Sequence, residues 1–372
     1  MRIGFDGKRA ANNLTGLGNY SRSIIAQLSQ FFPQNQYLVY TPKMKDHAQV
    51  RHFMATKNIE ARFPKYRKFL WRTFGIKRQL IDDQVALFHG LSHEIPVGIQ
   101  QTGIPSVVTV HDLIFLKFPQ YFGRIDRWIY TLKCRYACKH ADRIVAISEC
   151  TKRDIITFFN TPEDQIDVVY QSCDDSFKTP ATASVKAAVK EKYQLPDQFI
   201  LNVGTIETRK NLVTLIKALK NINPHYQLVV IGKQTAYMKQ VEEELKAQQL
   251  QSRVIFLSNI PFQDLPVIYQ LSSVFAYPSV YEGFGIPIIE ALYSGVPVVA
   301  ATGSCLEEAG GPASLYVPPD DDQALAKAIN SIIEDPVLST KMITEGIQYV
   351  QRFNNHIVST ELMNVYQRVF SQ

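Results

Sequence analysis

Short, strongly apolar runs alternate with amphipathic segments of helix length along almost the whole chain, and this alternation limits the fold more than any other feature. Several runs are continuously apolar, as strands are when helices cover both faces of their sheet. Alternation of strand and helix predicts parallel sheets built from βαβ units. The expected strands are Arg2–Phe5, Tyr37–Tyr40, Val85–His89, Ser106–Val110, Arg143–Ile147, Ile166–Tyr170, Phe199–Val203, Gln227–Ile231, Val254–Leu257, Val274–Tyr277 and Val296–Ala300.

Two such series of strands follow one another, which indicates two doubly wound domains. The chain has 372 residues, whereas a single hydrophobic core rarely serves more than about 300. The stretch 174–184 is polar, rich in small residues and contains a proline, as a linker does. We therefore expect a first domain at 1–178, a second domain at 185–354 and a final amphipathic helix within 355–372.

Composition narrows the class of protein. Hydrophobic residues make up 46% and charged residues 20% of the chain, which excludes a disordered, collagen-like or coiled-coil protein. No apolar run approaches the roughly 18 residues of a membrane span, and Asp6 interrupts the start where a signal peptide would be apolar. The five cysteines are scattered, so we expect reduced thiols and a cytoplasmic protein. Cys134 and Cys138 stand one helical turn apart, which a helix explains better than a metal.

The charge is unevenly distributed along the chain. Residues 1–178 carry 25 Lys and Arg against 16 Asp and Glu, a net charge of +9, although the whole chain carries +6. The excess gathers at 61–80, where seven Lys and Arg and five aromatic residues occur without an acid. This segment could be an amphipathic helix on an anionic membrane surface, or its apolar residues could pack on the sheet. No nucleic-acid-binding module accompanies it, so we expect no nucleic acid partner. The residues that would form the loose apolar face of such a helix are Tyr66, Phe69, Leu70, Phe74 and Leu80.

The first domain has polar candidates where its expected strands end, which is where doubly wound sheets bind ligands. His89 and His111 each follow a strand, and Ser148 follows another. Gly16 and Gly18 begin a glycine loop before a helix, but this loop lacks the third glycine of a dinucleotide fingerprint. The competing interpretations are structural histidines, a helix cap at Ser148 and a plain loop.

In the second domain, Arg209 and Lys210 follow the expected strand Phe199–Val203, just before a helix. Two cations at the start of a helix oppose its dipole, so their placement is easier to understand if an anion binds there. Guanidinium and ammonium groups can together hold a diphosphate and stabilise its charge as it leaves. The alternative is a solvated helix start.

The segment 278–292 carries the strongest pattern. Glu282 and Glu290 flank a Gly-x-Gly loop, and Pro287 suits the first turn of a helix. The loop can present backbone N–H groups to a phosphate or a sugar hydroxyl. Glu290 lies within an apolar helix, where a carboxylate can accept hydrogen bonds from a ribose diol, and Glu282 can do the same for a sugar ring. The alternative is a capped helix with a stray acid.

These segments together resemble the family 4 retaining glycosyltransferases of the GT-B fold. Glu282–Glu290 (EGFGIPIIE) is similar to the E-x7-E signature of that family, and Gly204–Asn211 (GTIETRKN) to its Arg-Lys segment. VHDL at 110–113 and FHG at 88–90 match its first-domain histidine elements. The resemblance implies an α/β protein with two facing, doubly wound Rossmann-like domains and a cleft between them, whose last helix crosses back to the first domain.

The resemblance also implies residue roles. The expected catalytic residues are His111, Glu282, Arg209 and Lys210. The expected donor-binding residues are Gly16, Gly18, Gly204, Thr205, Arg209, Lys210, Ser279, Glu282, Gly283, Phe284, Gly285, Ile286 and Glu290. The expected acceptor-binding residues are Gly16, His89 and Ser148. Thr205 is a departure, because many relatives carry an arginine there; this puts in question how many cations meet the diphosphate.

The function implied by the resemblance is transfer of a hexosyl unit, with mannosyl favoured, from a nucleotide sugar to a hydroxyl of a glycan or lipid-linked acceptor. The configuration would be retained, and the reaction would serve surface polysaccharide or lipopolysaccharide synthesis. We expect no cofactor, GDP-mannose or a UDP-hexose as the donor substrate, and a place at the inner face of the membrane if 61–80 binds lipid.

Alternatives to this function stay open. Asp320–Asp322 fits a D-x-D metal motif in form, but these acids precede a helix and are expected to cap it, so we expect no catalytic metal. A GT-B epimerase acting on the nucleotide sugar alone would share the nucleotide-binding residues. A non-catalytic, two-lobed sugar-binding protein is the alternative from a different class.

Overall fold

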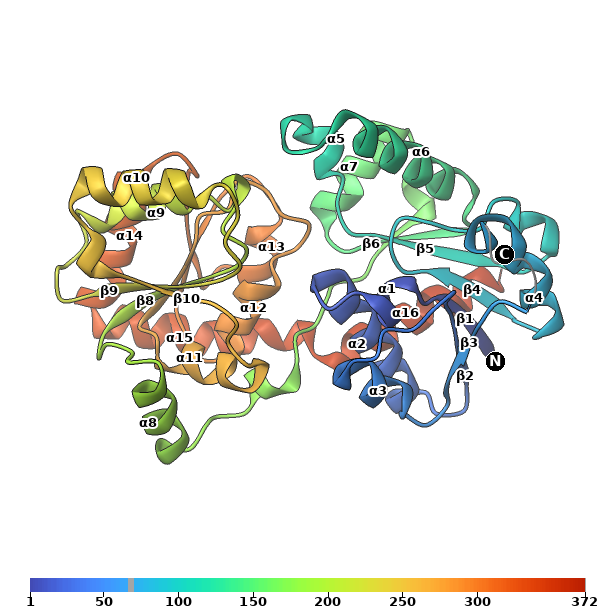
Figure 1. The fold of residues 1–372 in the computed structure, drawn as a ribbon, viewed down its shortest axis with the longest axis horizontal. Helices are drawn as coiled ribbons and strands as arrows, with labels where there is room; N and C mark the ends of the chain where they lie inside the picture. Colours follow the sequence, from blue (N-terminus) through green and yellow to red (C-terminus); the bar gives the residue numbers. More distant parts are fainter. Residues whose placement is uncertain (66–69, 372) are drawn as a thin grey trace. The chain divides into compact units, whose positions relative to one another are not determined.

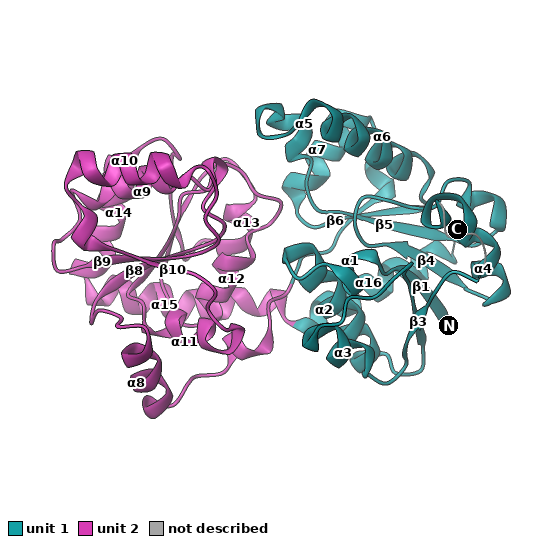
Figure 2. Ribbon diagram, in the orientation of Figure 1, with its two compact units in different colours: residues 1–171, 355–372 teal, residues 172–354 magenta. Residues whose placement is uncertain are grey.

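A computed structural model describes residues 1–65 and 70–371 of the chain. These residues form two compact units, 1–171 with 355–371 and 172–354 (Figure 2). Each unit is built around its own parallel sheet, so each is described separately.

Within the described residues, the first unit contains a parallel sheet of seven strands in the order β3-β2-β1-β4-β5-β6-β7. The order reverses between β1 and β4, which makes that point the topological switch where doubly wound sheets bind ligands. The strands are β1 (Arg2–Asp6), β2 (Gln36–Tyr40), β3 (Ile59–Arg62), β4 (Leu87–Gly90), β5 (Ser106–Val110), β6 (Arg143–Ala146) and β7 (Ile166–Val168).

Helices pack on this sheet and bury its apolar strands (Figure 1). The chain's last helix lies beside α2 and contributes Leu362 and Val365 to the same core cluster as Ile3 and Phe5 of β1. The helices are α1 (Lys8–Asn12), α2 (Gly16–Phe31), α3 (Ala48–Met54), α4 (Ile76–Asp82), α5 (Ile114–Lys117), α6 (Arg124–His140), α7 (Glu149–Phe159) and α16 (Asn355–Val369).

A buried polar bond also ties α16 to the sheet. His89 at the end of β4 is fully buried; its Nδ1 lies 2.7 Å from the Tyr366 hydroxyl and its Nε2 lies 2.8 Å from Thr109 Oγ1. Burial, with a smaller effect of His111, lowers the pKa of His89 to about 3, so the ring is neutral at physiological pH. This imidazole therefore joins the final helix to two neighbouring strands.

The second unit has a parallel sheet of six strands within the described residues, in the order β10-β9-β8-β11-β12-β13. Its order reverses between β8 and β11. The strands are β8 (Phe199–Val203), β9 (Gln227–Ile231), β10 (Val254–Leu257), β11 (Val274–Tyr277), β12 (Val298–Ala301) and β13 (Leu315–Val317). The helices are α8 (Ala183–Lys192), α9 (Leu212–Leu219), α10 (Met238–Gln248), α11 (Leu265–Leu271), α12 (Ile286–Tyr293), α13 (Leu306–Gly310), α14 (Asp322–Glu334) and α15 (Pro336–Val350).

The expected strands all appear, with ends that differ by up to two residues, but two strands were not predicted. Both β3 and β13 lie at an edge of their sheet and are short. Edge strands need no continuous apolar run because one side has no neighbouring strand, and β3 carries Glu60 and Arg62. Hydrophobic periodicity alone does not reveal such strands.

The linker expected at 174–184 is more ordered than its composition indicates. Asp175–Lys178 forms a short 3-10 turn (η5), and the Phe177 ring is buried with its centroid 5.5 Å from Tyr269 and 6.0 Å from Phe262. This packing explains why residues 172–178, which the sequence pattern grouped with the first domain, cluster with the second unit.

The basic segment 61–80 does not form one amphipathic helix. Its described residues comprise the end of β3, a π-helical turn at Trp71–Gly75 and the start of α4. Leu80 is buried in the core, whereas Leu70 and Phe74 are exposed. Tyr66 and Phe69 lie outside the described residues. The prediction of an apolar face assumed that one continuous helix covers the segment. Leu70 has a left-handed backbone (φ 49°), which an α-helix does not contain.

Two further expectations can be compared with the structure. Cys134 and Cys138 lie on α6 with both side chains buried, as one helical turn requires. In the part of the chain that the structure describes, no helix is both long enough and apolar enough to cross a bilayer.

The bond between α16 and the sheet gives the first prediction. Tyr366→Phe keeps the ring but leaves the buried Nδ1 of His89 without its hydroxyl partner, so we expect a loss of about 1–3 kcal/mol of unfolding free energy in denaturant titrations. Tyr130→Phe, which changes a half-exposed tyrosine on α6, is the control and should stay within about 0.5 kcal/mol of the wild type. Equal stability of the two variants would contradict a structural role for His89.

Candidate active site

The candidate site of the second unit lies beyond the carboxyl ends of β8 and β11. These strands are neighbours in the sheet although 70 residues separate their sequences. The segment after β8 carries Arg209 and Lys210, and the segment after β11 carries Ser279 and Glu282. Because the strands are parallel and adjacent, their following loops meet at the switch point.

Glycines shape the loop after β8. Gly204 has φ +152°, a conformation that other residues rarely adopt, and its carbonyl oxygen would lie 1.8 Å from a Cβ placed on Gly232. Thr208–Lys210 forms a single 3-10 turn, and Asn211 adopts a left-handed conformation before α9 begins. Thr205 is exposed in this loop.

The sequence argument for an anion site was that Arg209 and Lys210 oppose the dipole of the following helix, and the structure corrects that argument. Arg209 and Lys210 precede α9 rather than occupying its first turn, so the helix dipole is not what makes their placement costly. What balances them in this structure is an acid from the neighbouring loop.

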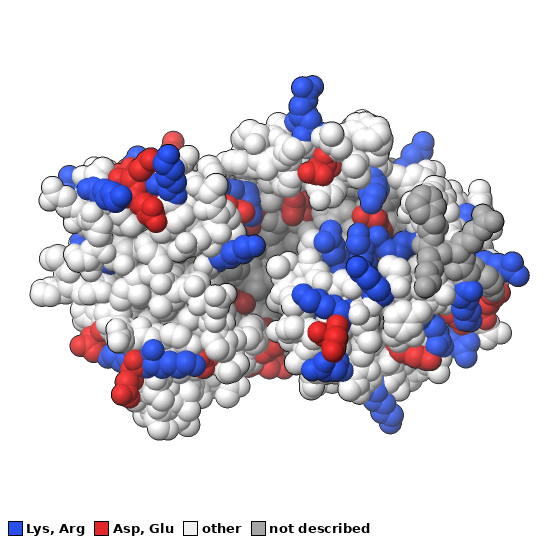
Figure 3. All heavy atoms as spheres, in the orientation of Figure 1, with Lys and Arg blue, Asp and Glu red and all other residues white. Residues whose placement is uncertain are grey.

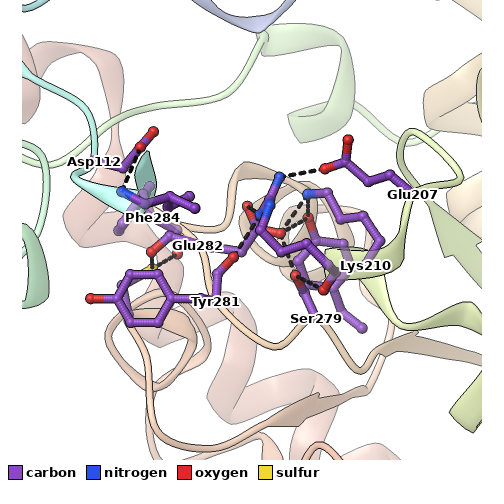
Figure 4. Close-up of polar contacts among 11 residues, drawn as sticks. Asp112, Glu207, Lys210, Ser279, Tyr281, Glu282 and Phe284 are labelled. Atoms are coloured by element: carbon purple, nitrogen blue, oxygen red, sulfur yellow. Dashed lines mark hydrogen bonds and ion pairs between the residues drawn. The ribbon is translucent and has the colours of Figure 1, made fainter. Parts of the chain in front are cut away.

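Glu282 is held by both cations (Figure 4). Its Oε2 lies 2.7 Å from Arg209 Nη1, and its Oε1 accepts a short hydrogen bond from Lys210 Nζ. The Ser279 hydroxyl lies 2.5 Å from the same Oε1, and the Tyr277 hydroxyl lies 3.2 Å from it. Between 11% and 17% of each of the three charged side chains is exposed, so the ion pairs are largely shielded from water.

The backbone of both loops is cross-linked through Arg209. Its Nη1 donates to the carbonyl of Tyr281 at 2.6 Å, and its own carbonyl accepts from the amide of Val280 at 2.9 Å. Its Nη2 lies 2.7 Å from Glu207, whose side chain is 38% exposed. Arg209 therefore joins its own loop to the Glu282 loop, and it also forms an ion pair with a second, more solvated acid, Glu207.

These contacts decide the protonation of Glu282. Burial alone would raise its pKa, but the charges of Lys210 and Arg209 and the hydrogen bonds from Lys210 and Ser279 lower the pKa of Glu282 to about 2. The carboxylate is therefore ionised throughout the physiological range.

The turn that starts α12 follows directly. Gly285 has φ +122° and caps the helix, and a Cβ there would lie 3.1 Å from Leu306 and 3.2 Å from Ala309 of α13. The Cys305 thiol lies 3.1 Å from the carbonyl of Glu282 and 2.9 Å from that of Phe284. The segment 282–285 is thus held in shape from the α13 side. In the first turn of α12, Pro287 has no N–H and the amide of Ile288 donates to the carbonyl of Gly285 at 2.9 Å. The amide of Ile286 has no acceptor within the helix, as the first amide of a helix does not, so it can bind an anion.

Glu290 has a different environment from Glu282. It lies one turn into α12, and the Tyr269 hydroxyl donates to its Oε2 at 3.0 Å. Burial has the largest effect and, with a smaller contribution from the charge of Asp174, raises the pKa of Glu290 to about 7, although the hydrogen bond from Tyr269 acts in the other direction. The charge of Glu290 in turn contributes to raising the pKa of the Cys173 thiol, although burial has the larger effect on that thiol. The pKa values of the two glutamates of the signature are therefore shifted in opposite directions.

In the first unit, His111 follows β5 and is almost fully buried. Its Nε2 lies 2.8 Å from the carbonyl of Leu91, and its Nδ1 lies 3.2 Å from the amide nitrogen of Gln171. The Leu91 carbonyl can only accept, so Nε2 carries the proton and Nδ1 accepts. Burial and the neighbouring His93 lower the pKa of His111 to about 3. Both ring nitrogens therefore have partners inside the unit.

The expected acceptor residues His89 and Ser148 are both fully buried. His89 binds Tyr366 and Thr109, as described above. Ser148 caps α7, where its Oγ accepts from the amide of Thr151 at 3.0 Å. The structure thus gives each of them a structural role and does not bring either to the surface. The side chain of a residue at the end of a strand can point into the core as well as toward solvent.

The glycine loop at Gly16 and Gly18 is the first turn of α2 rather than a loop. A Cβ on Gly18 would lie 1.8 Å from the carbonyl oxygen of Asn13, so packing alone requires glycine there. Gly16 is exposed, and a Cβ on it would meet nothing within 4 Å. Of the two, only Gly16 has the open side that ligand approach needs.

Several residues that shape these sites were not predicted. Tyr277 is the last residue of β11, so the strand-end rule that selected the other candidates would have found it. His93 stacks on His111 with ring centroids 5.5 Å apart, and its Nε2 accepts from the amide of His111 at 3.2 Å. Gln171 directly follows the expected strand Ile166–Tyr170, so the same rule would have found it. Tyr269 and Cys305 have no sequence signal, because their partners lie 21 and 23 residues away.

Of the acids at 320–322, Asp321 acts as a helix-capping residue. The Asp321 side chain accepts from the amide of Ala324 at 2.8 Å and caps α14. Among residues 1–65 and 70–371, no group of three or more His, Cys, Asp or Glu side chains is arranged to hold a metal ion.

Comparisons with known proteins match both halves of the chain. The profile of the family "Glycosyl transferases group 1" matches residues 186–349, and that of "Glycosyltransferase Family 4" matches residues 15–177. O-antigen chain mannosyltransferase B of Escherichia coli is 27% identical and covers 98% of this chain and 99% of its own length. O-antigen chain mannosyltransferase RfbU of Salmonella typhimurium is 28% identical over 74% of this chain and 70% of its own length.

The solved structures agree with the fold. HepE of Anabaena in complex with UDP-glucose superposes with a TM-score of 0.76 at 17% identity, covering both chains completely. At that identity the likeness concerns the fold alone, and it confirms the GT-B architecture with two Rossmann-like domains that the sequence predicted.

The environment of Glu290 predicts a pH-dependent stability. Its pKa of about 7 lies above the ordinary 4.5, so the unfolded chain ionises first, and the folded state loses stability as the pH rises from about 4.5 through 7. Glu290→Gln keeps the acceptor for Tyr269 and should be more stable than the wild type at about pH 8, by up to about 3 kcal/mol, an advantage that shrinks toward pH 4. Thermal unfolding of the ligand-free protein measures this. The exposed Glu334→Gln is the control, and identical melting of all three proteins at about pH 8 would contradict the assignment.

The two glycines of α2 form a matched pair. Gly18→Ala should cost at least about 2 kcal/mol of stability, because its methyl group meets the Asn13 carbonyl, whereas Gly16→Ala should unfold like the wild type. Chemical denaturation distinguishes the two. If Gly16 serves ligand approach, its alanine variant loses transfer activity while keeping its stability; unchanged activity would remove Gly16 from the site.

Proposed function

The chain belongs to the family 4 glycosyltransferases, and from that premise we propose that it transfers a hexosyl unit, mannose being favoured, from a nucleotide sugar to a hydroxyl of a glycan or lipid-linked acceptor. The proposal includes retention of the anomeric configuration, catalysis without a metal and a place on the cytoplasmic side of the membrane. The reaction would serve O-antigen or related surface polysaccharide synthesis.

One observation carries the choice of substrate class. A relative named as an O-antigen chain mannosyltransferase aligns with this chain over nearly the full length of both proteins. A second relative with the same activity in its name covers about three quarters of this chain. GDP-mannose is therefore the first donor to test, and UDP-hexoses are the second.

The geometry after β8 and β11 supports a diphosphate site. Arg209 and Lys210 carry two positive charges against the single charge of Glu282, which leaves the trio with +1. Glu207 offsets that charge, but its side chain is the most exposed of the four, so water screens its pairing with Arg209. We propose that the donor diphosphate takes the place of Glu207 on Arg209 and also contacts Lys210.

The remaining roles follow from the same loops. The amide of Ile286 at the start of α12 would bind a phosphate or sugar oxygen, and Glu282, ionised and oriented by Ser279, would accept hydrogen bonds from the transferred sugar. Glu290 would accept hydrogen bonds from the donor ribose. His111 stays a proposed contact of the transferred sugar, through an atom other than its bonded ring nitrogens.

The proposed reaction balances without a protein nucleophile. The acceptor oxygen forms a bond to the anomeric carbon on the face from which the diphosphate leaves, and the bond between that carbon and the phosphate oxygen breaks. The acceptor proton passes to the departing phosphate oxygen. Arg209 and Lys210 stabilise the charge that builds up on this oxygen.

The experiment has two stages. Thermal-shift measurements with a panel of GDP- and UDP-sugars identify the donor, because a ligand that binds only the folded state raises its stability. Transfer from that donor to a glycan or lipid-linked acceptor is then compared between the wild type and Lys210→Gln, which we expect to be slower by about 100-fold or more. Lys217→Gln, an exposed lysine of α9, is the matched control and should keep wild-type rates.

Two outcomes would count against the proposal. If no activated sugar raises the melting temperature, the nucleotide-sugar site is wrong. If the donor alone is converted into an epimer without an acceptor, the chain is an isomerase of the same fold rather than a transferase.

A further inference from the structure

Helix α6 exposes an apolar stripe that the proposed reaction does not use. Ile125, Trp128, Ile129 and Leu132 recur at the i, i+3, i+4 and i+7 positions of one helix face. Their exposed fractions are 75%, 64%, 36% and 46%, large values for side chains of this kind. We call these four residues the α6 stripe.

The α6 stripe points away from the core of its own unit. The buried residues of the helix are Cys134, Ala137 and Cys138. At about 100° per residue, their mean direction lies opposite that of the stripe. The helix therefore already buries one face and presents a second apolar face outward, which a helix that only covers a sheet does not need.

Basic residues accompany the stripe. The helix carries five Lys and Arg against one acid, Asp126. Arg124 and Lys139 flank the stripe near the two ends of the helix and are exposed. Lys133 is paired with Glu94, and the guanidinium of Arg135 lies 5.7 Å from the centre of the Phe159 ring. On the face seen in Figure 3, Lys and Arg gather more densely over the first unit than over the second. The basic residues of α6 are Arg124, Arg127, Lys133, Arg135 and Lys139.

An anionic lipid surface fits this combination. A tryptophan with aliphatic neighbours enters the headgroup region of a bilayer, and flanking cations are attracted to anionic headgroups. A second protein subunit would also cover apolar side chains, but it would have to supply acids opposite these cations, and the net charge of the first half of the chain, +9, repels a second copy. The helix lies at the edge of its unit beside α5 (Figure 1).

We propose that the first unit binds an anionic membrane surface through the α6 stripe and its flanking cations. This moves the membrane contact from 61–80, the segment that the charge pattern indicated, to a helix that begins 44 residues after that segment ends. The stripe inserts its apolar side chains at the level of the headgroups, and the helix axis lies along the membrane surface.

The two tryptophans of the chain make a direct test possible. Trp71 is 1% exposed in the core, whereas Trp128 belongs to the stripe and is 64% exposed. Vesicles of phosphatidylcholine mixed with phosphatidylglycerol should shift the emission of the full-length protein to shorter wavelength, and vesicles of phosphatidylcholine alone should not. Trp128→Phe keeps an aromatic side chain but should lose the shift, because only the buried Trp71 remains.

Vesicle flotation measures binding with matched variants. Ile125→Ser combined with Ile129→Ser should weaken binding by about tenfold or more, because two apolar side chains leave the bilayer. Arg124→Gln combined with Lys139→Gln should weaken it by about fivefold per charge, and raised salt should do the same to the wild type. Val337→Ser combined with Ile347→Ser changes exposed apolar residues of α15 and should bind like the wild type. Circular dichroism melting confirms that each variant is folded.

Three results would overturn the proposal. The first is equal binding to neutral and anionic vesicles, and the second is an emission shift that survives Trp128→Phe. The third is a wild-type dimer that the Ile125→Ser and Ile129→Ser changes convert to a monomer, since a second copy would then cover the stripe. None of these measurements needs a sugar donor, so they are independent of the proposed transfer reaction.

Discussion

The contact between Glu282 and the two cations Arg209 and Lys210 is the interaction on which the candidate site depends. It joins the loops after β8 and β11, which only the sheet order makes neighbours. A shielded carboxylate between two cations keeps its charge, and its ion pairs direct both cations into the same place. An anion that binds there meets side chains already held in position, so little conformational entropy is lost on binding.

The two glutamates of one signature differ because their surroundings differ. Glu282 lies among cations and hydroxyl groups, and its pKa falls to about 2, whereas Glu290 is buried beside a tyrosine hydroxyl, and burial raises its pKa to about 7. Spacing in the sequence places both on one loop and helix, but it does not reveal these charges. The first unit shows the same effect, because its histidines bond to residues of the unit itself and hold it together.

The sequence alone predicted the class of fold and the strands at the centre of each sheet. Central strands of parallel sheets are covered on both faces, and their continuous apolar runs are visible without a structure. The strand-end rule also selected Arg209 and Lys210, which the structure brings together with Glu282 of the 278–292 pattern and with Ser279, which the family resemblance implied. It did not separate residues that face outward from those that face inward, so His89 and Ser148 were selected although both are buried.

Local pattern thus determined the βαβ order and the positions of the charged loops, because these depend on residues that are neighbours in the sequence. Tertiary structure decided which acid meets which cation, which histidines are structural, and that α6 rather than 61–80 carries the exposed apolar face. Those outcomes depend on contacts between residues tens to hundreds of positions apart. The exposure and the protonation state of a side chain depend on which residues pack against it. Local patterns in a single sequence do not reveal those tertiary contacts.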